Sequence, residues 1–209
     1  MQLYHNPLSP NGRKVLAAIA HLGLGDKVEA KVVNPFQGET RTPEFLGINP
    51  NAKIPALVDG DFKLWESNVI VAYLADKAGN TEFWPTGNAR YDAMRWMTWE
   101  AAHFSTVVGV YLFENILKSM MGAGDPDANK LEQASKDFAR YGKVLDEQLG
   151  DRPFLLGGKP TVADFCVCAP LGYAGPAKVP VEQFPNLVAW MRRMDEVPAW
   201  ASTAHRMGG

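Results

Sequence analysis

Residues 4–15 read YHNPLSPNGRKV, and this stretch joins a short apolar strand to a helix. The strand starts at Gln2, and the helical pattern runs from Arg13 to Ala20. Two prolines fix the backbone of the turn between them, and Ser9 lies in that turn. A hydroxyl there faces the positive end of the helix dipole and unpaired backbone N–H groups. The turn therefore favours an anion, above all a thiolate, although a serine at a helix start is also an ordinary N-cap.

The elements that follow this turn predict an α/β domain. A second strand comes after the first helix, then a polar loop with a short helix, then an X-Pro step into a further strand. A tight Asp-Gly-Asp turn indicates a hairpin with a fourth strand, and a helix opens directly after it. The predicted order is therefore β-α-β-α-β-β-α. The ranges that carry it are 28–33, 56–58, 59–61, 62–65 and 66–76.

Strand patterns vanish in the second half of the chain. Residues 78–87 end one helix and form a linker, so we predict a first domain at 1–78 and an all-α domain at 88–209. Thr161 and Asp164 have the spacing of a capping box at the start of one helix. The predicted helices cover residues 89–121 (as one or two helices), 127–149, 161–169, 184–195 and 198–205.

Composition excludes several classes of function. The formal net charge is −2, and no basic run suggests nucleic-acid binding. No stretch is long and apolar enough to cross a membrane. The opening residues have neither a long apolar stretch nor a cleavage site, so we expect no signal peptide. Cys166 and Cys168 lie on one helix about 200° apart, which prevents easy pairing, and no His/Cys cluster accompanies them for a metal. We expect a cytoplasmic protein without a metal, with both cysteines buried.

Four motifs together make the chain resemble the cytosolic glutathione transferase family, from Leu3 to about Trp200. The serine resembles that of the theta, phi and related bacterial classes rather than that of the tyrosine classes. The resemblance implies a thioredoxin-like domain with a mixed four-stranded sheet, an all-helical domain after it, glutathione as co-substrate and a homodimer. The motifs are YHNPLSPNGRKV (4–15), NPNAKIPAL (49–57), ESNVI (66–70) and LLGGKPTVAD (155–164).

The resemblance gives Ser9 the role of donating its hydroxyl hydrogen bond to the glutathione sulfur. A free thiol has a pKa of about 8.5, and lowering it by about two units takes roughly 2.7 kcal/mol. One hydroxyl bond and the helix dipole can supply that amount. Asn11, two residues further on, either assists the thiolate or stabilises the turn.

The resemblance also assigns residues that bind glutathione. Pro55 would be cis, so that the backbone N–H and C=O of Ile54 pair with the cysteinyl backbone; without the resemblance, a trans proline starting a strand is preferred. Ser67 would hold the γ-glutamyl carboxylate at a helix N-terminus, with Glu66 facing the amine, whereas helix capping is the alternative for this pair. The glycyl carboxylate would meet Lys53 and Arg41. Many relatives have other residues at or near these two positions, and Arg41 is equally well explained as a solvated charge.

The second substrate would be a small hydrophobic electrophile, held between the first turn and the long helix of the second domain. From the turn we expect Asn6 and Leu8 to contact it. The helix offers several aromatic residues, most of which at helical spacing belong to the core. They are Trp96, Trp99, Phe104, Tyr111 and Phe113, of which we select Trp99, Phe104 and Tyr111.

The sequence therefore predicts a glutathione S-transferase that activates the thiolate for attack on an electrophilic carbon. Glutathione-dependent reduction of disulfides or peroxides, with Ser9 or Asn11 positioning the thiol, is the alternative among enzymes. A non-catalytic binding module of the same fold is the alternative outside them. The presence of Ser9, Pro55 and the Glu66-Ser67 pair argues against such a module, because a non-catalytic protein could lose each of them without harm.

Overall fold

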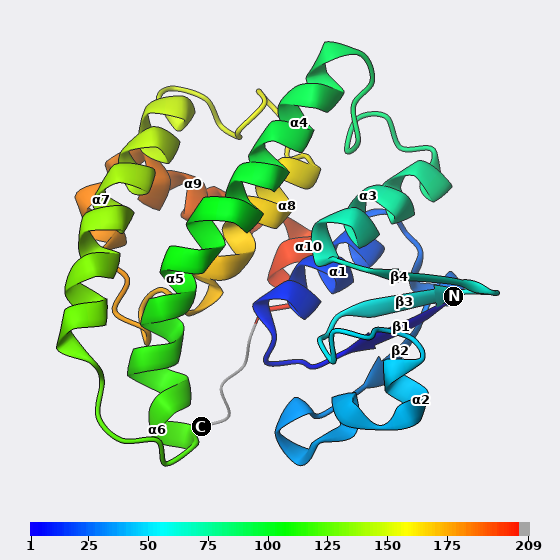
Figure 1. Ribbon diagram of the computed structural model, residues 1–209. Coiled ribbons are helices and arrows are strands. Elements are labelled where there is room, and N and C mark those ends of the chain that lie inside the picture. Colours follow the sequence, from blue (N-terminus) through cyan, green and yellow to red (C-terminus); the bar gives the residue numbers. More distant parts are fainter. Residues whose placement is uncertain (205–209) are drawn as a thin grey trace. The chain divides into compact units, whose positions relative to one another are not determined.

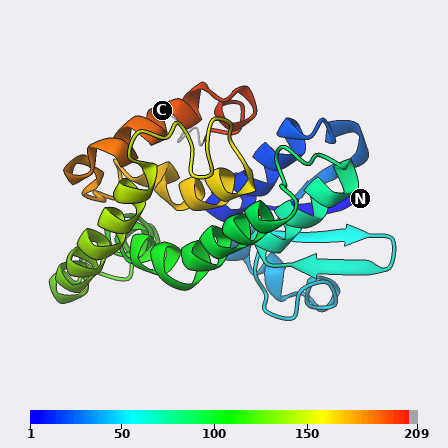
Figure 2. The same cartoon turned by 90° about the horizontal axis from the view of Figure 1, so that it is seen from above.

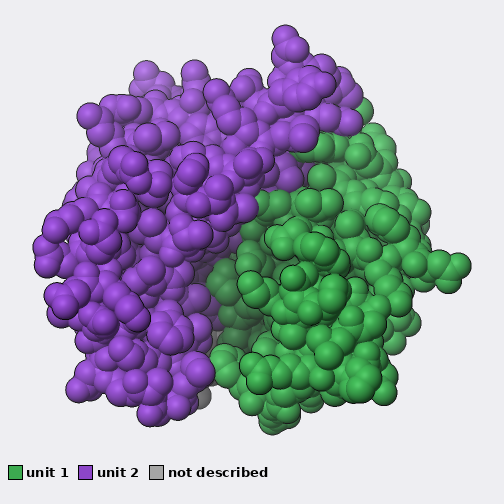
Figure 3. Space-filling model, viewed as in Figure 1, with its two compact units in different colours: residues 1–85, 197–209 green, residues 86–196 purple. Residues whose placement is uncertain are grey.

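The computed structural model describes residues 1–204. The chain forms two compact units, which Figure 3 shows in different colours. Unit 1 contains Met1–Pro85 and the described residues from Val197 onward, and unit 2 contains Thr86–Glu196.

Unit 1 is built on a mixed four-stranded sheet with the order β2-β1-β3-β4. The strand β1 is parallel to β2 and antiparallel to β3, and β3 is antiparallel to β4. In the register, Leu3 on β1 lies between Ala30 on β2 and Leu57 on β3. This topology confirms the predicted α/β domain with a mixed sheet. The strands are β1 (Gln2–His5), β2 (Glu29–Val32), β3 (Ala56–Asp59) and β4 (Phe62–Trp65).

The β3–β4 hairpin forms where the Asp-Gly-Asp turn predicts it, and Figure 2 shows its two strands side by side. Gly60 has a φ of 60°, a left-handed conformation that glycine adopts at little cost. Beside the turn of the hairpin, Asp59 accepts hydrogen bonds from Tyr73 Oη and Lys77 Nζ, both over 2.7 Å. These contacts tie the hairpin to the following helix.

Helices cover both faces of this sheet (Figure 1). On one face lie α1 (Pro10–His21) and α3 (Ser67–Ala78), which pack against each other. On the other lies the short α2 (Pro43–Leu46), whose Phe45 packs with Val33 and Ala56. Leu3 and Leu57 are fully buried in the core of the unit.

The last described helix, α10 (Pro198–Ala201), packs in unit 1, whereas the sequence places it in the helical domain. Trp200 is buried, and the guanidinium of Arg13 lies 4.1 Å from the centroid of its ring. The Nη2 atom of Arg13 also donates to the backbone oxygen of Trp200 over 3.3 Å. These contacts join residues that are far apart in the sequence, which a local pattern does not reveal. His205, the predicted end of this helix, lies outside the described residues.

Unit 2 is all-helical, as predicted. Its first helical stretch is continuous from Asn88 to Met120, but two segments within it, Glu100–Phe104 and Phe113–Leu117, are π-helical. Each π segment contains a buried glutamate, Glu100 or Glu114. The α-helices of the unit are α4 (Asn88–Trp99), α5 (Ser105–Leu112), α6 (Lys118–Met120), α7 (Ala128–Leu149), α8 (Val162–Cys168) and α9 (Pro185–Glu196).

The predicted capping box at the start of α8 is present. One carboxylate oxygen of the buried Asp164 accepts the backbone N–H of Thr161 over 2.8 Å. The other accepts the backbone N–H of Leu155 and the indole N–H of Trp190, over 2.8 and 3.0 Å. Both cysteines of α8 are buried, as expected. None of the described helices has the length and apolar character that crossing a membrane requires.

Candidate functional site

Ser9 is the N-cap of α1 and lies in the turn that the sequence singles out. Its φ and ψ of −82° and 120° are extended, and its Oγ accepts the backbone N–H of Gly12 over 3.1 Å. A serine hydroxyl has one donor and two acceptor positions. The cap uses an acceptor position and leaves the O–H as a donor. The capping role and the thiol-activating role are therefore compatible in one side chain.

Asn6 holds this turn together. Its Nδ2 donates to the backbone oxygen of Val33, and its Oδ1 accepts the N–H of Leu8, both over 3.0 Å. Its backbone oxygen accepts the N–H of Ser9 over 3.0 Å. The structure thus gives Asn6 a structural role in the turn, whereas the Leu8 side chain beside it is 46% exposed.

Gly12 lets the turn close tightly on the strand. A methyl group in place of its hydrogen would lie 3.0 Å from the backbone oxygen of Asn6 and 3.4 Å from Cβ of Ser9. The same position is 3.5 Å from Cβ of the buried His5. Burial lowers the pKa of His5, and a hydrogen bond with the backbone of Asn6 opposes that shift. A neutral imidazole therefore lies behind the turn at neutral pH.

The loop before β3 is shaped by asparagines. Asn49 is buried, and its Nδ2 donates to the backbone oxygen of Lys53 over 2.6 Å. Its Oδ1 accepts the backbone N–H of Asn51 over 3.0 Å. This loop leads into the Ile54–Pro55 peptide bond, which is cis, as the family resemblance implies.

The start of α3 has an unusual backbone. Glu66, its N-cap, has a φ of 70°, in the left-handed region that a residue with a side chain seldom adopts. Such residues cluster at functional sites, where the conformation costs about 1–3 kcal/mol. The Glu66 side chain makes no capping hydrogen bond. One residue on, Ser67 Oγ donates to Oδ1 of Asn11 over 3.3 Å, which links α3 to the first turn of α1.

These segments meet around a cavity of about 150 Å³ in unit 1. It gathers most of the predicted glutathione-binding residues together with Asn11. Ser9 and Arg41 are not among the residues that line it, and Arg41 is exposed. The lining residues are Asn11, Asn49, Asn51, Lys53, Ile54, Pro55, Glu66 and Ser67.

The sequence did not predict a role for two of the residues that line this cavity, Asn49 and Asn51. The Asn-Pro-Asn run at 49–51 carries a signal, because asparagine and proline together are typical of a turn held by side-chain hydrogen bonds. Reading that turn chemistry would identify Asn49 as the residue that shapes the loop before Pro55.

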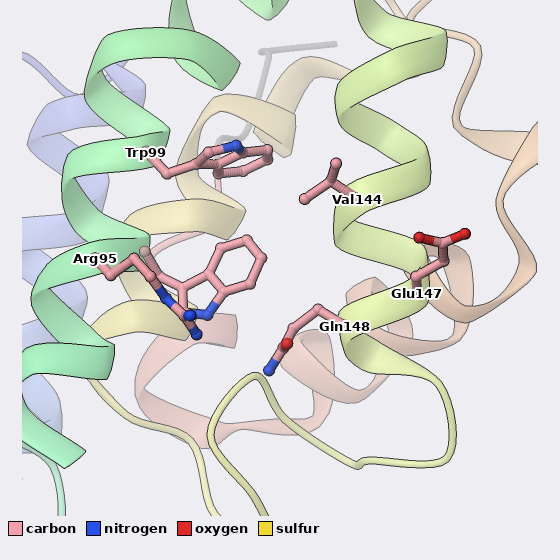
Figure 4. Close-up of a pocket in the computed structure, with 6 residues that line it drawn as sticks. Arg95, Trp99, Val144, Glu147 and Gln148 are labelled. Atoms are coloured by element: carbon pink, nitrogen blue, oxygen red, sulfur yellow. The ribbon is translucent and has the colours of Figure 1, made fainter. Parts of the chain in front are cut away.

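The aromatic residues predicted to contact substrate lie in unit 2. Trp99 stacks on Phe104, with ring centroids 5.1 Å apart. Phe104 is fully buried and Tyr111 is 5% exposed, so packing in the helical core accounts for both. Trp99 is half-buried and borders a cavity of about 420 Å³ between α4 and α7 (Figure 4). The other residues lining this cavity are Arg95, Trp96, Val144, Glu147 and Gln148.

Comparison with known protein families gives matches in both halves of the chain. The family model described as "Glutathione S-transferase, N-terminal domain" matches residues 1–76. The model described as "Glutathione S-transferase, C-terminal domain" matches residues 128–193.

Individual proteins match over nearly the whole chain. Glutathione S-transferase 3 of Zea mays is 31% identical over 208 residues, which cover 97% of this chain and 92% of that protein. The crystal structure of glutathione transferase F7 from Populus trichocarpa has a TM-score of 0.90 at 25% identity and covers 100% of this chain and 99% of that one. A glutathione transferase family member from Pseudomonas fluorescens Pf-5, with two glutathione bound, has a TM-score of 0.86 at 30% identity, covering 98% and 92% of the two chains.

Proposed function

The chain belongs to the glutathione S-transferase family, and from that premise we propose that it activates the glutathione thiol for attack on small hydrophobic electrophiles. Glutathione is the co-substrate and binds in the 150 Å³ cavity of unit 1. The observation that carries this proposal is the convergence on that cavity of the cis-proline loop and the N-terminus of α3. Both segments come from separate parts of the sequence, and both present backbone hydrogen-bonding groups.

Each end of glutathione has a chemical partner in this cavity. The γ-glutamyl carboxylate binds at the N-terminus of α3, where first-turn backbone N–H groups, that of Ser67 among them, donate hydrogen bonds. Glu66 lies near the amine of the same residue. The backbone N–H and C=O of Ile54 pair with the cysteinyl backbone, and Lys53 attracts the glycyl carboxylate. Arg41 as a second partner of that carboxylate stays a prediction.

Ser9 then stabilises the thiolate. Its O–H, which the N-cap does not use, donates to the sulfur, while the N-terminus of α1 contributes the positive end of a helix dipole. The thiol proton leaves to water. The thiolate forms a carbon–sulfur bond with the electrophile, which either releases a halide or takes up a proton after addition across an activated double bond.

The electrophile binds beside the exposed Leu8 side chain, which offers an apolar surface next to Ser9. The roles of Trp99, Phe104 and Tyr111 in substrate contact stay predictions. From the same family premise we place the protein in the cytoplasm as a homodimer.

The test is the ultraviolet absorbance of the bound thiolate against pH, for the wild type and Ser9→Ala. We expect the thiol of bound glutathione to titrate well below its free value of about 8.5, and to move back by about one to two pH units in Ser9→Ala. A bound thiol pKa that is the same in both proteins would remove Ser9 from the mechanism. Asn11→Ala would then be the variant to measure.

One observation favours a second candidate function. Asn11, not Ser9, lines the cavity, and an amide can position a thiol for disulfide exchange. Glutathione-dependent reduction of a mixed disulfide would proceed by attack of the glutathione thiolate on sulfur and release of the other thiol. Turnover of a disulfide substrate faster than that of an aryl halide would establish this reaction, and loss of that turnover in Asn11→Ala would assign it to Asn11.

A further inference from the structure

Asn49 holds the loop that leads into β3. Its backbone oxygen accepts the N–H of Ala52 over 3.1 Å, and its Oδ1 accepts the backbone N–H and the Nδ2 of Asn51 over 3.0 and 2.9 Å. Its Nδ2 donates to the backbone oxygen of Lys53 over 2.6 Å. The backbone N–H of Asn49 donates in turn to the oxygen of the buried Phe45 on α2 over 2.9 Å. Asn49, itself 2% exposed, therefore fixes this loop to the core of unit 1.

The chemistry of these bonds sets the orientation of the Asn49 amide. The backbone oxygen of Lys53 can only accept a hydrogen bond, whereas the backbone N–H of Asn51 can only donate one. Nδ2 must therefore face Lys53, and Oδ1 must face Asn51. A leucine could make neither bond, and an ionised aspartate could make only the second, because it has no donor. The loop thus depends on both ends of one amide group.

The bond from Asn49 to Lys53 also sets the direction of the next N–H group. A peptide unit is planar, and in the trans form its C=O and N–H point in opposite directions. Within residues 1–204 the only cis peptide bond is Ile54–Pro55, so the unit between Lys53 and Ile54 is trans. Because Asn49 holds the C=O of this unit, the N–H of Ile54 points away from the Asn49 side chain.

The backbone of Ile54 has no partner within the fold. In the part of the chain that the structure describes, neither its N–H nor its C=O makes a hydrogen bond to another backbone group. Ile54 lines the cavity of about 150 Å³, as Lys53 and Asn49 do. Backbone groups of a folded protein are paired in nearly all cases, so an unpaired one at a cavity is available to a ligand. The N–H of Ile54 is thus a donor that the fold holds in place beside the cavity.

We propose that Asn49 is a positioning residue, which aims the N–H of Ile54 at the cysteinyl carbonyl of glutathione. This inference rests on the proposed function, in which Ile54 pairs with the cysteinyl backbone. Hydrogen bonds at the two ends of one peptide unit polarise it and strengthen each other, so the bond from Asn49 also makes the Ile54 N–H a better donor. The site therefore selects ligands with a carbonyl at this position, and that selectivity depends on Asn49.

The first test measures how strongly the site favours this carbonyl, with and without the donor of Asn49. The ligands are glutathione and its analogue in which a trans carbon–carbon double bond replaces the cysteinyl–glycine peptide bond. The analogue keeps the thiol and both carboxylates but lacks the carbonyl. For the wild type, we expect calorimetry to give a dissociation constant about 3-fold to 10-fold higher for the analogue.

Asn49→Asp removes the donor to Lys53 and keeps the acceptor for Asn51. We expect the ratio of the two dissociation constants to fall by about threefold or more in this variant. The added carboxylate repels both ligands, because both have a glycyl carboxylate, and the glycyl N–H is missing from the analogue in both proteins. Neither effect changes the comparison of the ratios. A ratio equal to that of the wild type would overturn the role of Asn49.

Asn80→Ala is the matched control. The Oδ1 of Asn80 also holds a turn of unit 1, where it accepts the N–H groups of Glu82 and Phe83 over 3.1 and 2.9 Å, and Asn80 does not line the cavity. This variant should lose stability and keep the wild-type ratio. A ratio that fell in the control as well would make the effect a general loosening of unit 1 and would contradict the proposal.

A measurement on the wild type keeps the inference testable if Asn49→Asp does not fold. The NMR chemical shift of the Asn49 side-chain N–H reports on its bond to Lys53. We expect glutathione to move this proton further downfield than the analogue does, because only glutathione places an acceptor at the other end of the peptide unit. Equal shifts, or equal affinities of the wild type for the two ligands, would overturn this inference alone. A wild type that binds no glutathione would overturn the proposed function itself.

Discussion

Ser9 Oγ accepts the backbone N–H of Gly12 over 3.1 Å, so the residue proposed to activate the thiol is also the cap of its helix. The two roles use different parts of one hydroxyl group. Capping needs only an oxygen acceptor, whereas stabilising a thiolate needs the O–H donor. Substitutions can therefore separate them.

Ser9→Asp should keep the cap and lose the activation. Aspartate caps helices about as well as serine, so the free energy of unfolding should stay close to the wild-type value. Its carboxylate cannot donate to the sulfur and repels the thiolate, so the pKa of the bound thiol should rise. Ser9→Ala should lose both functions, with a stability loss of roughly 0.5–2 kcal/mol. Urea unfolding and thiolate absorbance measure the two effects, and full activity in Ser9→Asp would contradict this division of roles.

Glu66→Gly should raise stability and weaken glutathione binding. The φ of 70° at Glu66 is unfavourable for a residue with a Cβ, and glycine relieves it, so we expect about 1 kcal/mol of added stability. The carboxylate proposed to face the ligand's amine is lost at the same time. Lys178→Gly is the matched control, because Lys178 has a φ of 59° and lies in unit 2. It should gain stability with no change in glutathione affinity; a control that also weakened binding would undermine the interpretation.

The sequence predicts those parts of the fold that depend on neighbouring residues. The strand-turn-helix around Ser9, the hairpin turn at Gly60 and the capping box at Asp164 all have local signals, and the structure confirms these elements. The π-helical segments carry no such signal, because the apolar spacing of residues 100–104 fits an α-helix as well.

Contacts between distant residues are the part that could not be predicted. Asn11 and Ser67 are 56 residues apart, and Arg13 and Trp200 are 187 apart. Lys14 shows why the residue type alone does not predict burial: lysine is expected at the surface, but Lys14 is 1% exposed on α1, a helix that packs against α3. The candidate site was therefore predicted as a set of residue types, and the links between them required the structure.

The lowered pKa of His5 predicts that the folded protein loses stability in mildly acidic solution. Burial lowers its pKa in the folded protein, whereas the unfolded chain titrates near the ordinary value of about 6.5. Below that pH the unfolded state binds more protons, so stability is complete above about 6.5 and falls as the pH drops. His21, also with a lowered pKa, contributes in the same window. The free energy of unfolding of His5→Gln should therefore depend less steeply on pH than that of the wild type. Identical pH dependences in the two proteins would exclude His5 as a cause of the stability loss.

Gly142→Ala and Gly109→Ala should shift stability in opposite directions, although both replace a glycine inside a helix of unit 2. A Cβ on Gly142 would collide with the ring of Phe184, which packs edge-on against Phe138 with centroids 5.8 Å apart. We expect a loss of roughly 1–3 kcal/mol, because overpacking forces the ring or α7 to move. A Cβ on Gly109 meets no heavy atom within 4 Å, so the better helix propensity of alanine should add about 0.5–1 kcal/mol. Denaturant unfolding of the two variants measures both values, and a gain at Gly142 would show that Phe184 can repack without cost.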